Sequence, residues 1–244
     1  MNPRITLATT RRVLDQLRAD HRTVALILVV PALLLSLLWW VYDGAPIFDR
    51  LAVTMLGILP MVVMFLVTSV AMLRERTSGT LERLLTTPMH RADLLLGYAV
   101  AFTLMAILQA TVLWAVCRWL LGVQTRGPVG WLLIVAAASA AVGVAMGLLA
   151  SAFARTEFQA VQFMPLVIVP QLFLCGLLVA REAMPQLLQW AANVLPLSYA
   201  VEGLRAVGSQ TDPSADAVRD ALVLAGFALV ALTLAAVSMP RKTR

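Results

Sequence analysis

Charged side chains are scarce in this sequence. Only 13% of its 244 residues are charged and 61% are hydrophobic, whereas about 25% of the residues in an ordinary soluble domain are charged. So few polar side chains cannot cover the surface of a water-soluble domain. The composition therefore predicts a protein embedded in a membrane.

Lysine is almost absent. Eighteen of the 19 basic residues are Arg, and the single Lys is Lys242. A Walker A phosphate loop requires Gly-Lys-Ser/Thr at the start of a helix, and Arg241 precedes Lys242. We therefore expect no ATPase site and no enzyme activity in this chain. The net charge of +6 is scattered between apolar runs, which argues against a nucleic-acid partner.

Metal-ligating and titratable residues are also few. The two cysteines, Cys117 and Cys175, each lie in a long apolar run, where a free thiol packs as a small hydrophobe, the alternative being a disulfide or a metal pair. No Asp, Glu or His falls inside the apolar runs, although ion-coupled transporters usually place such groups in the membrane. An intramembrane enzyme would likewise need a catalytic dyad or a metal set. We predict no metal and no cofactor bound by this chain.

Six apolar runs are long enough to cross a bilayer, which takes about 20 residues of helix. They are residues 24–42, 51–73, 94–121, 130–153, 161–180 and 221–239. They predict an all-α polytopic membrane protein with one transmembrane domain over residues 1–244. In residues 1–23, apolar and small residues recur every three or four positions, as in a helix lying at the membrane surface. These residues are Leu7, Thr10, Leu14, Leu17 and His21.

The arginines are distributed unevenly between the two sides. If the N-terminus is cytoplasmic, the inner segments hold 13 of the 19 basic residues and the outer segments hold the other six. Cytoplasmic loops carry such an excess of basic residues. We therefore expect both termini to be cytoplasmic.

Residues 74–93 form the loop between the second and third runs. Gly79 can end the long helix before it, Thr80 can cap a new one, and Pro88 must stop it. The leucines at 81, 84 and 85 lie on one face of this short helix, edged by Glu82 and Arg83. This pattern predicts a small docking surface at the inner side of the membrane.

Two motifs resemble the membrane subunit of type-2 ABC exporters, in particular the drug and antibiotic branch. The first comprises Glu75-Arg76, Gly79-Thr80, Glu82 and Thr87-Pro88. The second is the segment Leu195–Arg205, similar to the family's Pro-Leu-Thr-Tyr segment that ends in Arg before the last span. Thr77 departs from the pattern, because the family usually has an acid there.

The resemblance implies a permease that pairs with a second permease, identical or homologous, and with two ATPase subunits that hydrolyse Mg-ATP. It implies export of a hydrophobic or amphipathic compound, such as a drug, an antibiotic or a lipid-like molecule, across a bacterial cytoplasmic membrane; the alternative is a polysaccharide or glycolipid exporter of the same architecture. The loop after the second span would be the coupling helix. Its interface residues would be Arg74, Glu75, Arg76, Gly79, Thr80, Leu81, Glu82, Arg83, Leu84, Leu85 and Pro88.

A substrate pathway is expected on the second and fifth spans. Its candidate residues are Met61, Met64, Phe65, Gln171 and Phe173. For the methionines and Phe65, packing or lipid contact is the alternative. Gln171 follows Pro170, so the alternative for this residue is to satisfy backbone carbonyls that proline leaves without a donor.

Residues 181–207 are too polar to span the bilayer and predict two short re-entrant helices at the outer side. By resemblance they would cap the exit, with outer-gate residues Pro196, Tyr199, Glu202 and Arg205. Glu202 and Arg205 lie three residues apart and are expected to pair locally. In the fourth run, Gly143 and Gly147 permit close helix approach, either within one subunit or between two.

Overall fold

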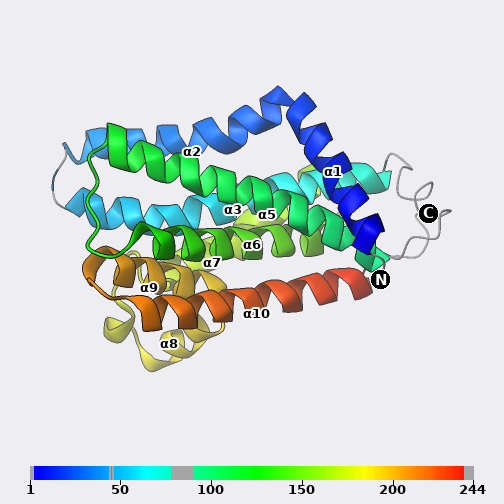
Figure 1. Cartoon of the computed structure of the whole chain (residues 1–244). Coiled ribbons are helices and arrows are strands. Elements are labelled where there is room, and N and C mark those ends of the chain that lie inside the picture. The colour runs from blue at the N-terminus through cyan, green and yellow to red at the C-terminus, as the bar shows by residue number, and fades with distance from the viewer. Residues whose placement is uncertain (1–2, 44, 46, 78–90, 239–244) are drawn as a thin grey trace.

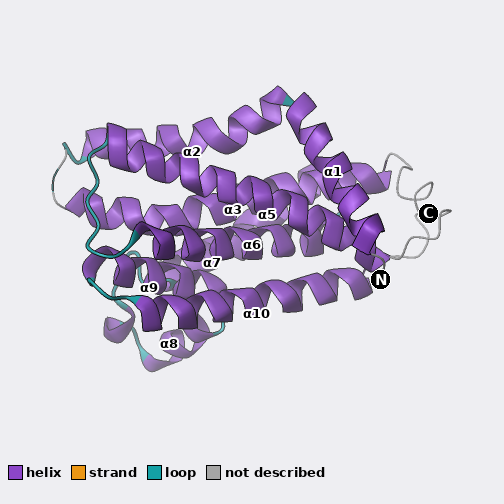
Figure 2. Ribbon diagram, in the orientation of Figure 1, coloured by secondary structure: helices purple, strands orange, loops and turns teal. Residues whose placement is uncertain are grey.

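The structure, a computed structural model, describes residues 3–43, 45, 47–77 and 91–238. Over these ranges the chain is helical without a β-strand, and six helices are long and apolar enough to cross a membrane. The prediction of an all-α polytopic membrane protein is confirmed. The long helices run side by side along one axis (Figures 1 and 2). They are α2 (His21–Val41), α3 (Ile47–Thr77), α5 (Arg91–Ala115), α6 (Val129–Phe153), α7 (Glu157–Leu174) and α10 (Ser214–Ser238).

The bundle has two distinct ends. The start of α1 (Pro3–Ala19), the end of α3, the start of α5 and the end of α10 lie together at one end, which we call the terminal end (Figure 1). Helices α8 (Gln186–Asn193) and α9 (Pro196–Ser209) lie at the other, which we call the cap end. A π-helical turn, η1 (Val116–Leu120), continues α5 toward the cap end, and a 3-10 turn, η2 (Arg181–Ala183), precedes α8.

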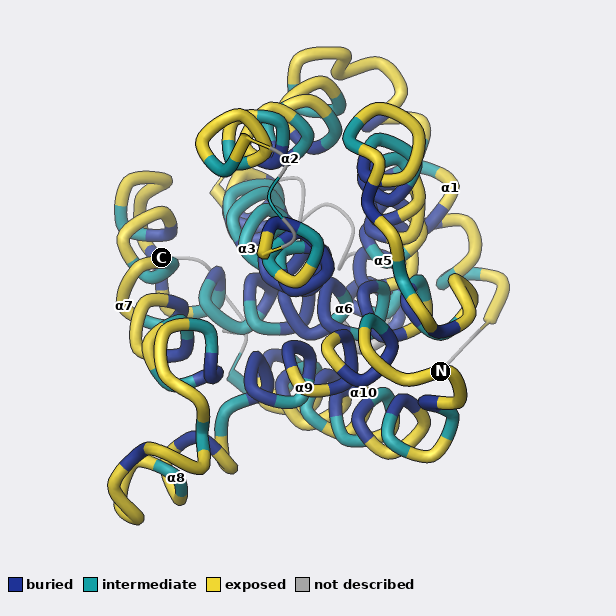
Figure 3. Tube along the Cα trace, turned by 90° about the vertical axis from the view of Figure 1, so that its left-hand side faces the viewer, coloured by how far each residue is buried: buried dark blue, intermediate teal, exposed yellow. Residues whose placement is uncertain are grey.

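Helices α3 and α6 form the centre of the bundle (Figure 3). A Cβ added at Gly143 would collide with the Met61 carbonyl oxygen, and one at Gly147 would lie 2.5 Å from the Phe65 carbonyl oxygen. One turn earlier, the Ser139 hydroxyl donates to the Gly57 carbonyl at 2.8 Å. Small residues at four-residue spacing thus bring the two backbones into direct contact. Gly143 and Gly147 therefore pack within one chain.

Helix α1 is a separate helix that packs on α5. Val13 and Leu17 are buried in this contact. The Thr10 hydroxyl donates to the Gly97 carbonyl at 3.2 Å, and a Cβ at Gly97 would overlap the side chain of Thr9. Leu7, one member of the predicted apolar stripe, faces outward instead. Packing against α5 therefore accounts for part of the amphipathic pattern.

Helix α7 ends earlier than the apolar run that predicts it. The helix stops at Leu174, whereas the run extends to 180. Gly176 adopts a φ of +87°, a left-handed conformation that glycine takes without steric cost and that turns the chain away from the helix axis. The chain then passes through η2 and the largely exposed α8 to α9, which is buried against α3, α6 and α10 (Figure 3).

The contact between α3 and α6 leads to a direct prediction. Gly143→Ile places a branched side chain against the α3 backbone, so the helices must separate, at a cost on the order of 1–3 kcal/mol or more. We expect a lower melting temperature for the detergent-purified chain. Gly130→Ile is the matched control, because a Cβ at Gly130 on the same helix meets no atom within 4 Å. Equal melting temperatures for the two variants would contradict the packing.

Candidate functional site

Three consecutive side chains at the end of α3 reach three different helices. They are Arg74, Glu75 and Arg76, which we call the α3 triplet. Successive residues of an α-helix point about 100° apart, so the triplet spreads around the helix. Each member makes a long-range polar contact with another helix, and together these contacts tie α3 to α7, α1 and α6.

Arg74 binds the first residue of α7. Its Nε and Nη2 donate to the two carboxylate oxygens of Glu157, at 2.7 and 2.9 Å. This two-point geometry fixes orientation as well as distance. Both side chains are more than half exposed, so the pair contributes well under about 1 kcal/mol to stability in water. The pair joins the start of α7 to the end of α3.

Glu75 binds α1 in a more enclosed setting. Its Oε1 accepts a hydrogen bond from Arg12 Nη1 at 2.6 Å, and the exposed fractions of the two side chains are 11% and 30%. Arg12 also donates to the Tyr98 hydroxyl at 3.4 Å, and its guanidinium lies 6.0 Å from the centre of the Tyr98 ring. This contact therefore holds α1, α3 and α5 together at the terminal end.

Arg76 binds the end of α6. The side chain is buried, and its Nη1 donates to the carbonyl oxygen of Ser151. Ser151 lies in the last turn of α6, where carbonyl groups lack a donor from a following turn. A cation there also compensates the negative end of the helix dipole.

The residues predicted for ATPase coupling fall into two groups. The α3 triplet is described, and its members have partners inside the chain. The remaining eight lie outside the described residues: Gly79, Thr80, Leu81, Glu82, Arg83, Leu84, Leu85 and Pro88. The triplet thus leads directly into the predicted coupling segment. Contact of either group with an ATPase stays a prediction.

The residues predicted for the substrate pathway do not share one surface. Met61, Met64 and Phe65 are buried inside the chain, where Met61 and Phe65 border the α6 glycines. Phe173 is 60% exposed on α7.

Gln171 is buried and connects α7 to α9. Its Nε2 donates to the Val167 carbonyl at 3.0 Å, next to the Leu166 carbonyl that Pro170 leaves without its usual donor. Its Oε1 accepts from the Leu197 N–H at 3.3 Å, in the first turn of α9. Gln171 thus hydrogen-bonds backbone groups, but its acceptor is the Val167 carbonyl rather than the Leu166 carbonyl that Pro170 leaves without its donor.

The outer-gate residues lie in and around α9. Pro196 begins the helix, and the Tyr199 hydroxyl donates to the Asn193 carbonyl at 2.8 Å. The expected Glu202–Arg205 pair does not form. Glu202 instead pairs with Arg181 at 2.5 Å and with Arg219 at 3.4 Å.

Arg205 faces a different group. Its Nη2 donates to the Gly176 carbonyl at 2.8 Å, in the turn after α7. Arg205 is thus bound to the turn after α7, while Arg181 of η2 and Arg219 of α10 bind Glu202. Arg181, Glu202 and Arg205 line a cavity of about 340 Å³ at the cap end.

Sequence reasoning missed the partners of the α3 triplet. Arg12, Ser151 and Glu157 are 63 or more positions away from the side chains they contact. The spacing of charges along one helix carries no information about such pairs. Only the helix arrangement reveals them.

The architecture defines a multi-span membrane protein in which α1, α6 and α7 are tied to the last turn of α3. Residues 4–208 match the ABC-2 type transporter family, which covers more than half of the chain. The chain belongs to the ABC-2 type transporter family.

Several curated proteins are similar to parts of the chain. Over 139 residues (57% of this chain, 19% of the relative) it is 27% identical to ABC transporter G family member 20 of Dictyostelium discoideum. It is 28% identical over 143 residues (58%, 38%) to the probable multidrug ABC transporter permease YbhS of Escherichia coli strain K12. It is also 28% identical over 164 residues (67%, 42%) to the linearmycin resistance permease protein LnrN of Bacillus subtilis strain 168. The chain thus covers less than half the length of each of these relatives.

The Arg12–Glu75 contact can be tested by reversing its charges. Arg12→Glu or Glu75→Arg alone places like charges together in a partly buried site, and we expect each to lower stability by about 1.5–3 kcal/mol. The double variant should recover a large part of this loss in a double-mutant cycle measured by thermal unfolding. Arg11→Glu is the control, since its contact with Asp15 is 3.9 Å long and exposed. Additive losses in the double variant would contradict a direct pair.

Proposed function

We propose that the chain is the permease subunit of an ATP-driven exporter that moves a hydrophobic or amphipathic compound, such as a drug, an antibiotic or a lipid-like molecule, out across a bacterial cytoplasmic membrane. Two separate ATPase subunits hydrolyse Mg-ATP, and a second permease, identical or homologous, completes the transporter. Surrounding membrane lipid is the other partner. A polysaccharide or glycolipid exporter of the same architecture is the alternative.

The α3 triplet is the observation that carries this proposal. The three side chains precede residues 78–90 and bind α1, α6 and α7. A force applied to the segment that follows α3 therefore acts on four helices together. This is the arrangement that a membrane subunit needs in order to convert motion of an attached ATPase into movement of its spans.

The drug branch is supported by the relatives and by composition. YbhS is named a probable multidrug permease and LnrN a linearmycin resistance permease. Aromatic residues make up only 7% of the chain, whereas a glycan conduit would favour more of them. We therefore rank a hydrophobic or amphipathic substrate above a sugar polymer.

The terminal end faces the cytoplasm in this proposal. The excess of arginine in segments at that end supports the orientation, because basic residues are retained on the cytoplasmic side. The predicted coupling segment, which begins after Thr77, then lies where a cytoplasmic ATPase can reach it.

Cysteine labelling tests the orientation. In a background without Cys117 and Cys175, we expect Gly44→Cys and Ser209→Cys to react with an impermeant maleimide in intact cells. Phe158→Cys, at the start of α7, should react only after the membrane is opened. Phe158 and Ser209 are exposed. The reverse labelling pattern would contradict the orientation.

Charge substitutions in the predicted coupling segment test the function. Leu84→Asp or Glu82→Arg should leave membrane insertion intact, because the segment lies outside the apolar spans. Either change should abolish export and weaken co-purification of the ATPase. An unpaired charge in an apolar contact costs on the order of 2–5 kcal/mol, about thirty-fold or more in affinity.

Cys117→Ala, in a buried position with no proposed role, is the matched control. Export rate and the amount of bound ATPase are measured for all three variants. Normal export by the Leu84→Asp and Glu82→Arg variants, with the ATPase bound, would contradict the coupling assignment.

A further inference from the structure

A pocket of about 370 Å³ lies between α1, α2, α3 and α5 near the terminal end. Its volume is within the range of about 300–1,000 Å³ typical of small-molecule sites. Its inner wall is apolar and comes from all four helices. The apolar lining residues are Val13, Leu17, Leu26, Leu66, Val67, Val70, Ala71 and Phe102.

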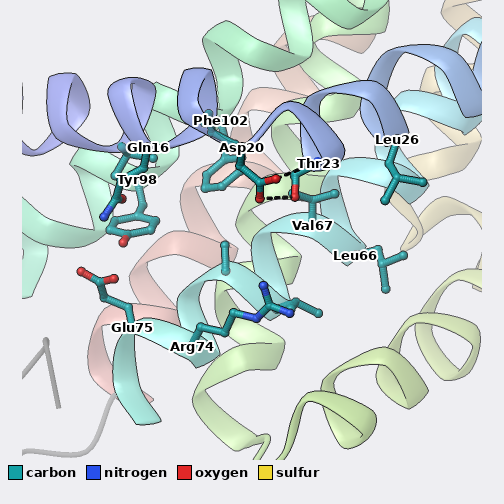
Figure 4. Close-up of a pocket in the computed structure, with 14 residues that line it drawn as sticks. Gln16, Asp20, Thr23, Leu26, Leu66, Val67, Arg74, Glu75, Tyr98 and Phe102 are labelled. Atoms are coloured by element: carbon teal, nitrogen blue, oxygen red, sulfur yellow. Dashed lines mark hydrogen bonds between the residues drawn. The ribbon is translucent and has the colours of Figure 1, made fainter. Parts of the chain in front are cut away.

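The polar groups of the pocket gather on one side of it. Figure 4 shows Asp20 and Thr23 at the joint between α1 and α2, with Arg74 and Glu75 on α3 opposite them. Leu26 and Leu66 lie farther along the helices, away from these groups (Figure 4). The pocket is therefore amphipathic, with an apolar portion and a charged portion.

Two of the three charges are already neutralised within the chain. Glu75 is paired with Arg12 at 2.6 Å, and Arg74 is engaged by both carboxylate oxygens of Glu157. Asp20 accepts hydrogen bonds from the Thr23 N–H at 3.1 Å and from its hydroxyl at 2.6 Å. Within 3–43, 47–77 and 91–238 no ion pair with it is found within 4 Å, and its carboxylate interacts electrostatically with Arg74 at longer range. These hydrogen bonds lower the pKa of Asp20, so it is ionised at neutral pH.

We propose that this pocket binds a monocationic amphiphile, with its apolar part among Leu66, Val67 and Phe102 and its ammonium group against the Asp20 carboxylate. The lining favours an apolar body. The charged groups of the pocket and their ion-pair partners are three carboxylates (Asp20, Glu75 and Glu157) and two guanidinium groups (Arg12 and Arg74), so one negative charge is in excess. A carboxylate ligand would be repelled, and a neutral alcohol would gain no charge pairing. The site is separate from the pathway residues predicted on α3 and α7, and binding there requires neither ATP nor export.

A phospholipid is the competing occupant. Arg74, the cation among the pocket-lining residues, already directs Nε and Nη2 to Glu157, which weakens its attraction for the phosphate of a zwitterionic headgroup. The charge arrangement therefore favours the amine over the lipid.

Photo-crosslinking tests the proposal on the whole chain in phosphatidylcholine nanodiscs. The probe is a decylamine with a diazirine at the end of its alkyl chain, and labelled residues are mapped by mass spectrometry. We expect labels on α3 and α5 near Val67 and Phe102. The matched alcohol, decanol with the same diazirine, should label these residues about three to ten times less.

Asp20→Asn separates charge recognition from folding. Asn is as good an N-cap as Asp, so the hydrogen bond from the Thr23 N–H and the start of α2 are retained while the charge is removed. Amine labelling should fall to the level of the alcohol. Val67→Trp, which fills the pocket, should abolish labelling by both probes.

Three results would overturn the proposal. Equal labelling by the amine and the alcohol would exclude charge recognition. Unchanged amine labelling in a folded Asp20→Asn protein would exclude Asp20. Displacement of the probe by phosphatidylethanolamine, but not by unlabelled decylamine, would assign the pocket to lipid.

Discussion

The direct contact between the backbones of α3 and α6 is the constraint on which the rest of the structure depends. Gly143 and Gly147 leave no room for a side chain between α6 and the carbonyls of Met61 and Phe65. In a membrane there is little hydrophobic driving force between helices, so such close packing supplies much of the attraction. The remaining helices are arranged around this central pair (Figure 3).

The α3 triplet connects this central pair to other helices. Arg76 binds the last turn of α6, the same helix that α3 packs against along its length. Glu75 and Arg74 then attach the peripheral helices α1 and α7 to the same point. The terminal ends of four helices are thereby connected through one turn of α3. At the cap end, Gln171 and Glu202 perform a comparable task for α9.

Local features were predictable from the sequence, and long-range partners were not. The six spans follow from apolar runs of sufficient length, because hydrocarbon thickness sets the length of a helix. The glycines at 143 and 147 indicated a close approach, but not that Met61 would be the partner. The motif pointed to Glu75, yet its contact with Arg12 depends on where α1 lies. The expected Glu202–Arg205 pair was wrong, because Glu202 pairs instead with Arg181 and Arg219, which lie in distant segments.

The central claim is that the α3 triplet makes the terminal ends of α1, α3, α6 and α7 move as one body. The most direct measurement is the distance between spin labels at Arg11 on α1 and Phe158 on α7, by double electron–electron resonance. The labelled chain is mixed with an excess of unlabelled chain, and the transporter is assembled with its ATPase. The distance is then measured with and without bound ATP. The account predicts the same Arg11–Phe158 distance distribution in both states. A distribution that shifts when ATP binds would contradict it.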